Sequence, residues 1–198
     1  MPTRTIFLPG AGGSASFWRP VADRLNIGGT FLSWPGLGNE APDPRINGLD
    51  DLVALVVGQI DGPVNVVAQS MGGVVAIRAA LAKPHLIEKL VLAVTSGGIP
   101  IAEFGAADWR SDYYRSFPNA ARWIGAPAAD LSNEIRTISA PTLLLWGDRD
   151  DISPVGVGRR LGSLLQNAKL HVLAGAGHDL ALTHADEAAG LMAAHLRA

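Results

Sequence analysis

The segment Val64–Val75 reads VNVVAQSMGGVV and decides the fold class of this chain. Its first half is an apolar run rich in β-branched residues, which predicts a strand buried on both faces. The apolar residues after Ser70 predict a helix, so this serine stands on a sharp strand-to-helix turn. Ala68 and Gly72 lie two positions before and after it, where small residues let the strand and the helix pass closely.

The turn at Ser70 admits two interpretations. In the first, the serine is a nucleophile in a strained backbone conformation, as in the G-x-S-x-G pattern, with Ala68 in place of the first glycine. The helix that begins near Met71 would then direct its free N–H groups toward developing negative charge. In the second, Ser70 only caps the helix, which is a common role of serine.

Outward from this turn, short apolar runs alternate with helical patterns. Strands are predicted at residues 5–8, 30–34, 64–68, 90–94, 142–146 and 169–173, and helices at residues 17–25, 49–60, 71–83, 154–165 and 185–197. This alternation predicts an α/β fold with a doubly wound, mainly parallel six-stranded sheet flanked by helices. With 198 residues, the chain is expected to form a single domain, residues 1–198.

Residues 97–140 break the rhythm, because the segment has no predicted strand and is rich in Gly, Pro, Ala and aromatic residues. A strand-free segment of this length predicts an inserted helical lid rather than an ordinary loop. Its aromatic side chains Trp109, Tyr113 and Tyr114 are candidates for the lining of a substrate pocket. The alternative is that they only pack the lid together.

Composition narrows the classes of function. The net charge of −2 and the absence of a basic stripe argue against nucleic acid as a partner. No apolar run approaches the ~20 residues that a membrane span needs, and the start of the chain does not resemble a signal peptide. The chain has no cysteine, which excludes disulfides and thiolate chemistry. We expect a cytoplasmic protein, monomeric or homodimeric, without a membrane partner.

A glycine-rich loop, residues 9–14, follows the first predicted strand and precedes a helix. Such a loop can turn backbone N–H groups toward a cavity, and the backbone of Ala11 and Met71 is predicted to supply two donors for an oxyanion. A phosphate-binding loop is less compatible, because neither a Gly-Lys-Ser/Thr ending nor G-x-G-x-x-G is present. An ordinary strand-to-helix turn remains the alternative.

An acid and a base follow the last two predicted strands, at the edge where parallel sheets bind ligands. Asp150 is the preferred acid and Asp148 the reserve. His178, on a glycine-rich loop, is the preferred base and His184 the reserve. The order Ser, Asp, His suits nucleophilic catalysis, in which the imidazole removes the hydroxyl proton and the carboxylate orients the imidazole. The other histidines are expected to be packed in a strand or exposed, and they are His85, His171 and His195.

Taken in order, these motifs resemble the α/β-hydrolase superfamily, in its esterase, lipase and peroxidase-like branch. The motifs that carry the resemblance are Leu8–Gly13, Trp34–Gly38, Gln69–Gly73, Leu145–Asp150 and Gly177–His178. In that family the last aspartate of the Gly-x-x-Asp loop is catalytic, which is the main reason to prefer Asp150.

The sequence departs from the family pattern at three points. Pro9 replaces the usual histidine before Gly10, Ala68 replaces the first glycine of the elbow, and the chain starts at what would be the family's third strand. Branches that carry aspartate at the nucleophile position, the haloalkane dehalogenases and epoxide hydrolases, are not expected. None of these departures removes Ser70, Asp150 or His178.

The resemblance implies a serine hydrolase that cleaves an ester or thioester of a small, largely apolar acyl compound through an acyl-enzyme. The same family also admits a carbon–carbon hydrolase, an amidase, a lyase, a perhydrolase, or a catalytically silent ligand-binding protein. We expect a small-molecule acyl substrate as the partner. No metal cluster or cofactor loop is visible in the sequence, and the expected chemistry needs neither.

Overall fold

The computed structural model describes residues 3–126 and 128–197 of the chain and centres on one six-stranded sheet. Its strands lie in the order β2-β1-β3-β4-β5-β6, and every neighbouring pair is parallel. Their bounds are β1 Arg4–Leu8, β2 Thr30–Phe31, β3 Val64–Gln69, β4 Ile87–Ala93, β5 Thr142–Gly147 and β6 Ala168–Leu173. The predicted doubly wound, parallel sheet is confirmed.

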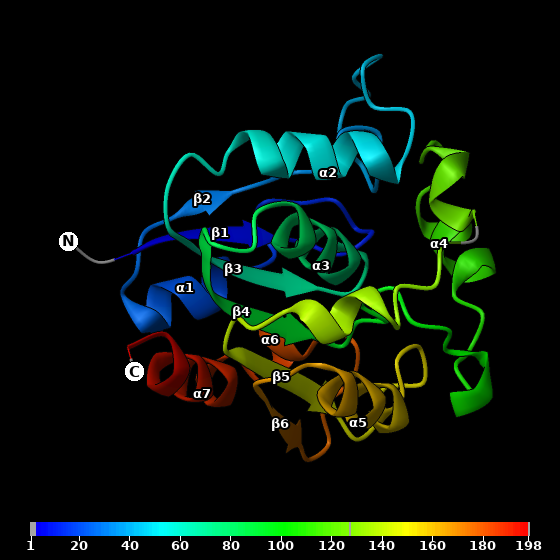
Figure 1. Ribbon diagram of the computed structural model, residues 1–198. Helices are drawn as coiled ribbons and strands as arrows, with labels where there is room; N and C mark the ends of the chain where they lie inside the picture. Colours follow the sequence, from blue (N-terminus) through cyan, green and yellow to red (C-terminus); the bar gives the residue numbers. More distant parts are fainter. Residues whose placement is uncertain (1–2, 127, 198) are drawn as a thin grey trace.

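Helices cover both faces of the sheet (Figure 1). Helix α1 packs on α7 on one face, and α2 packs on α3 on the other. The bounds are α1 Arg19–Leu25, α2 Leu49–Gly58, α3 Met71–Ala82, α4 Arg110–Ser116, α5 Val155–Leu164, α6 Leu180–Thr183 and α7 Ala185–Arg197. Parallel strands that are covered on both faces must be apolar on both, which explains their nearly continuous apolar runs.

The second strand is shorter than the sequence predicts. Residues 30–34 were expected in the sheet, but β2 ends at Phe31. One further ladder bond joins the Leu32 N–H to the Phe7 carbonyl, and then the chain turns away. The backbone N–H of Trp34 donates to Gly13, and its indole N–H donates to Pro9. This part of the run therefore holds the glycine-rich loop instead of extending the sheet.

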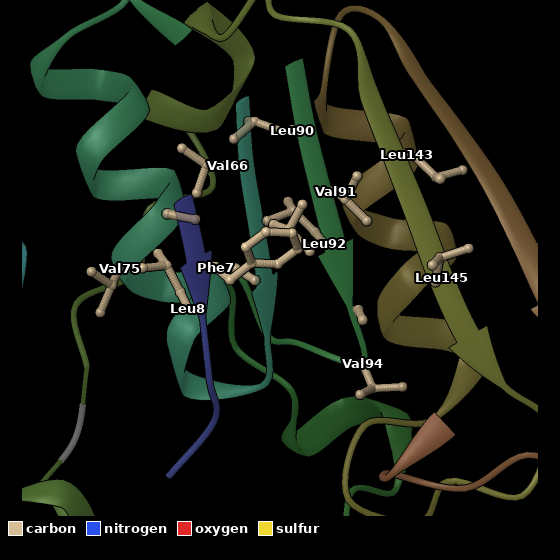
Figure 2. Packing of buried hydrophobic residues seen from close by; sticks show 14 of the residues in the cluster. Phe7, Leu8, Val66, Val75, Leu90, Val91, Leu92, Val94, Leu143 and Leu145 are labelled. Carbon is tan, nitrogen blue, oxygen red and sulfur yellow. The ribbon is translucent and has the colours of Figure 1, made fainter. Parts of the chain in front are cut away.

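The core is one apolar cluster between the sheet and its helices. Figure 2 shows side chains of β1, β3, β4 and β5 gathered in this cluster together with Val75 of α3. Helix α3 is buried along most of its length because it lies at the centre of one face of the sheet. Full burial of one Leu, Ile or Val side chain stabilises the fold by about 1.5–3 kcal/mol.

Most of the lid segment, residues 97–140, lies beyond the carboxyl ends of the strands, at the right of Figure 1, whereas its last part, from Glu134 on, runs back beside α3 toward the start of β5. Its described residues form α4 and three 3-10 turns, Ala102–Phe104, Arg122–Gly125 and Glu134–Thr137. They form no strand, in line with the composition of this segment. The loops that carry the candidate residues and most of the described lid segment therefore lie at the same edge of the sheet.

Candidate active site

Ser70 stands at the sharp turn between β3 and α3, where its backbone φ is +53°. Few non-glycine residues adopt a positive φ, so this conformation marks a strained position. Two backbone bonds hold the turn: the Ser70 N–H donates to Ala93 at 2.9 Å, and the Ser70 carbonyl accepts from Gly73 at 2.9 Å. A Cβ on Gly72 would lie only 2.3 Å from the Pro9 carbonyl oxygen, which explains why this neighbour is glycine.

Three side chains from three loops form one hydrogen-bonded chain. His178 Nε2 lies 2.9 Å from the Ser70 hydroxyl oxygen, and His178 Nδ1 lies 2.8 Å from a carboxylate oxygen of Asp150. An ionised carboxylate only accepts, so the Nδ1–H tautomer donates to Asp150 and leaves Nε2 to accept from the hydroxyl. The Ser70 side chain makes no helix-capping bond. The N-cap interpretation of this serine is therefore wrong.

Asp150 is held rigidly on the loop after β5. Its other carboxylate oxygen accepts backbone N–H bonds from Ile152 and Ser153, at 2.9 and 3.0 Å, and its side chain is fully buried. The reserve acid, Asp148, is exposed and accepts a bond from the Gly175 N–H instead. The structure thus brings Asp150, and not Asp148, to the imidazole.

The remaining histidines lie away from Ser70. His184 bonds to the adjacent Thr183 hydroxyl, His171 is half-buried in β6, and His85 is exposed. His195 was expected at the surface, but it is half-buried on α7 with an unpartnered Nε2 among the described residues. Burial lowers the pKa of His195 below its usual 6.5. The helical pattern near the chain end did not reveal this contact with the sheet.

The glycine-rich loop lies beside the elbow, as its position after β1 requires. In the described part of the chain, neither the Ala11 N–H nor the Met71 N–H donates to another backbone or side-chain group. Both residues line the cavity in front of Ser70. Two free donors from these backbones fit the requirements of an oxyanion hole. The Pro9 carbonyl accepts from the buried Trp34 indole, which helps to hold the loop in place.

A large open cavity of about 1390 Å³ lies between the elbow and the lid segment. Its lining contains many apolar side chains, among them Met71, Val74, Val94, Ile99, Ile101, Leu131, Ile152 and Leu182. Trp109 and Tyr113 line it too. Tyr114 does not, because its hydroxyl turns away and donates to the Arg122 carbonyl. The placement of Tyr114 in the pocket is therefore wrong.

The two arginines in the cavity lining are each paired with an aspartate. Arg78 contacts Asp50 at 2.6 Å, and Arg110 contacts Asp108 at 2.9 Å. Hydrogen bonds from Arg110 lower the pKa of Asp108, which keeps that carboxylate ionised. Among the described lining residues there is accordingly no cationic side chain without an acidic partner.

Sequence reasoning missed three residues that support the site. Gln69, buried at the end of β3, donates from its amide to the His178 carbonyl at 3.0 Å. The Thr95 hydroxyl donates to the Ser70 carbonyl at 2.5 Å. Val94 lies at a positive φ of 43°, an outlier for a β-branched residue, and lines the cavity. Only their position at the carboxyl end of a strand, or directly after it, could have drawn attention to them.

Comparison with known proteins places the chain in a family. The model of the alpha/beta hydrolase family matches residues 5–191. The chain belongs to the alpha/beta hydrolase family. A 2-hydroxy-6-oxononadienedioate/2-hydroxy-6-oxononatrienedioate hydrolase of Paraburkholderia xenovorans is 26% identical, with 90% of this chain and 80% of the relative covered. A pimeloyl-[acyl-carrier protein] methyl ester esterase of Neisseria meningitidis is 27% identical, with 79% and 78% covered.

Solved structures agree on the fold of this alpha/beta hydrolase. A thermophilic esterase from Thermogutta terrifontis superposes with a TM-score of 0.81 at 17% identity, covering all of this chain and 90% of the esterase. At this identity the likeness concerns the fold alone. In residues 3–126 and 128–197, no helix has the length and apolar character needed to cross a bilayer. The same residues contain no group of three His, Cys, Asp or Glu side chains placed to hold a metal ion.

Proposed function

We propose that this alpha/beta hydrolase is a serine hydrolase that cleaves an ester or thioester of a small, largely apolar acyl compound. The observation that supports the proposal is the continuous hydrogen-bonded chain from the Ser70 hydroxyl through His178 to Asp150, at 2.9 and 2.8 Å. A serine hydroxyl is a weak nucleophile unless a base removes its proton during attack. In this proposal His178 is that base and Asp150 is its orienting acid.

The proposed reaction has two halves. In the first, Ser70 Oγ attacks the carbonyl carbon while His178 Nε2 accepts the hydroxyl proton, and the N–H groups of Ala11 and Met71 stabilise the oxyanion. Collapse of this intermediate transfers the proton from His178 to the leaving alcohol or thiol and leaves an acyl-serine. In the second, His178 activates water, which attacks the acyl-serine and releases the acid. Asp150 stabilises the imidazolium in both halves.

The substrate class rests on the cavity. Its many apolar side chains favour a hydrocarbon acyl chain, since burial of apolar surface drives such binding. Arg78 and Arg110 are each paired with an aspartate, and further aspartates line the cavity, so a substrate carboxylate would meet net negative charge there at an electrostatic cost. An uncharged acyl group avoids this cost.

A fluorophosphonate probe and a panel of p-nitrophenyl esters and acyl thioesters of graded length test the proposal. We expect a covalent mass adduct on the wild type and its loss in Ser70→Ala. Ser96→Ala is the matched control, because Ser96 lines the same cavity but bonds to the Gly98 N–H. Ester turnover in Ser70→Ala and His178→Ala should fall by about 10⁴-fold or more, without additive losses in the double variant.

Carbon–carbon bond hydrolysis is the second candidate, and the relative from Paraburkholderia xenovorans favours it by its name. The same Ser70, His178 and Asp150 would serve that reaction. A vinylogous 1,5-diketone substrate in the panel separates the two: turnover of this substrate well above that of the esters would replace the ester assignment. A wild type that forms no fluorophosphonate adduct would refute both and favour a ligand-binding protein.

A further inference from the structure

Tyr113 joins the lid segment to the glycine-rich loop through its hydroxyl group. The hydroxyl donates to the Ala11 carbonyl at 2.8 Å and accepts from the Gly38 N–H at 3.0 Å. Tyr113 lies on α4 and is only 9% exposed. One buried side chain from the lid segment therefore bonds to the same residue that offers a free N–H to the cavity.

The rest of the loop is held from another side. Trp34 donates to the carbonyls of Pro9 and Gly13, and Gly38 packs so closely that a Cβ on it would lie 2.0 Å from the Gly12 carbonyl oxygen. These contacts come from the turn after β2. The contact from the lid segment falls on the Ala11 carbonyl.

The two peptide units around Ala11 are thus fixed separately. The Gly10 carbonyl accepts from the Gly13 N–H at 3.0 Å, which orients the planar unit that carries the Ala11 N–H. Tyr113 orients the next unit by holding the Ala11 carbonyl. Together the two bonds restrict φ and ψ of Ala11 and, with them, the direction of its N–H group.

We propose that Tyr113 is a positioning residue that aims the Ala11 N–H at the oxyanion from the lid segment. This inference rests on the proposed function, because an oxyanion forms only if Ser70 attacks a carbonyl. It assigns Tyr113 a role beyond the pocket lining that the sequence suggests. Catalysis then depends on the position of the lid segment. Among the described residues, Tyr113 is the only lid residue that hydrogen-bonds to the glycine-rich loop.

The surroundings suit this role. Burial raises the pKa of Tyr113, so its hydroxyl stays protonated and can donate. Trp109 packs edge-on against the Tyr113 ring at 5.5 Å between centroids, and Phe117 packs at 5.2 Å. Trp109 also lines the cavity. Trp109 therefore both faces the space for the acyl group and supports the Tyr113 ring.

The first test compares Tyr113→Phe with Tyr114→Phe, the matched control whose hydroxyl bonds only within the lid segment. For Tyr113→Phe we expect kcat/KM for p-nitrophenyl butyrate to fall about 10- to 100-fold, as a misaimed oxyanion donor implies. Binding of a butyl trifluoromethyl ketone, which forms an oxyanion adduct with serine, should weaken by the same factor. Binding of butyl methyl carbinol, an alcohol with the same butyl chain that cannot form this adduct, should stay within twofold. Tyr114→Phe should leave all three unchanged.

A second measurement keeps the side chain at nearly full size. With 3,5-difluorotyrosine at position 113, the phenol ionises at lower pH and then cannot donate to Ala11. We expect kcat/KM to fall on the alkaline side in this protein over a range where the wild type is flat. A pH profile identical to that of the wild type would overturn the role of Tyr113.

These outcomes also distinguish a failure of the Tyr113 proposal from a failure of the proposed function. Equal weakening of ketone and carbinol in Tyr113→Phe, or unchanged kcat/KM, overturns the positioning role while ester hydrolysis by the wild type stands. A wild type without ester turnover and without a fluorophosphonate adduct refutes the proposed function, and the role of Tyr113 falls with it.

Discussion

Asp148 and Asp150 lie two positions apart on one loop, yet their surroundings are opposite. Asp150 is buried and receives two backbone N–H bonds besides its contact with His178. Asp148 is exposed and bonds to the next loop. A buried carboxylate is tolerated only when it is fully hydrogen-bonded, and that condition is met here at the position that touches the imidazole.

This contrast predicts the effects of two substitutions. Asp150→Asn should lower kcat for an ester substrate by roughly 10⁴-fold, because an amide at this site stabilises the wrong imidazole tautomer. Asp148→Asn should stay within about threefold of the wild type, since only an exposed loop contact changes. Steady-state kinetics with p-nitrophenyl butyrate measure both. Equal losses in the two variants would leave the assignment of Asp150 without support.

At the scale of elements, the site depends on how closely β1, β3 and α3 approach one another. A Cβ on Gly72 would meet the Pro9 and Leu8 carbonyl oxygens at 2.3 and 3.0 Å. These are backbone atoms of the neighbouring strand and its loop, so they cannot turn aside as a side chain does. Close approach of helix and strand is thus what holds the elbow next to the glycine-rich loop.

We therefore expect Gly72→Ala to lower the free energy of unfolding by about 3 kcal/mol and to lower activity with it. The control is Gly190→Ala on α7, where a Cβ would have nothing within 4 Å. Alanine there should raise the free energy of unfolding by about 0.5–1 kcal/mol, because glycine is unfavourable inside a helix. Urea unfolding followed by tryptophan fluorescence measures both. A neutral Gly72→Ala would contradict the close-approach argument.

At the scale of the whole molecule, α7 packs against α1 and β5, and His195 on this helix is half-buried. Burial and the nearby Lys89 on β4 lower the pKa of His195, while contacts with the backbone of Leu90 and Pro141 act in the opposite direction. Because the folded pKa lies below the unfolded value of 6.5, the unfolded state binds the proton first as the pH falls. Stability is therefore full above 6.5 and declines as the pH drops toward the folded pKa.

The corresponding variant is His195→Gln, which removes the titrating group but keeps a polar side chain. Thermal unfolding between about pH 7.5 and about pH 5.5 should show a smaller loss of Tm in His195→Gln than in the wild type. Parallel Tm curves for the two proteins would show that this histidine does not contribute to acid sensitivity.

The sequence by itself determined the α/β class and the parallel sheet. Strands that are covered on both faces need continuous apolar runs, whereas helices repeat their apolar residues with a different period. It also singled out Ser70 and His178 as site candidates, since small residues at an elbow and a glycine-rich loop are local requirements. Asp150 came from the resemblance to the family.

Only the tertiary structure decided which of these groups meet. Burial separates Asp150 from Asp148, the turn of Trp34 toward the glycine-rich loop shortens β2, and the α4 register places Tyr113 on Ala11 while Tyr114 points away. Each of these outcomes depends on a contact between segments far apart in the chain. Local propensity and spacing carry no information about such contacts, because the partner is set by how the elements pack.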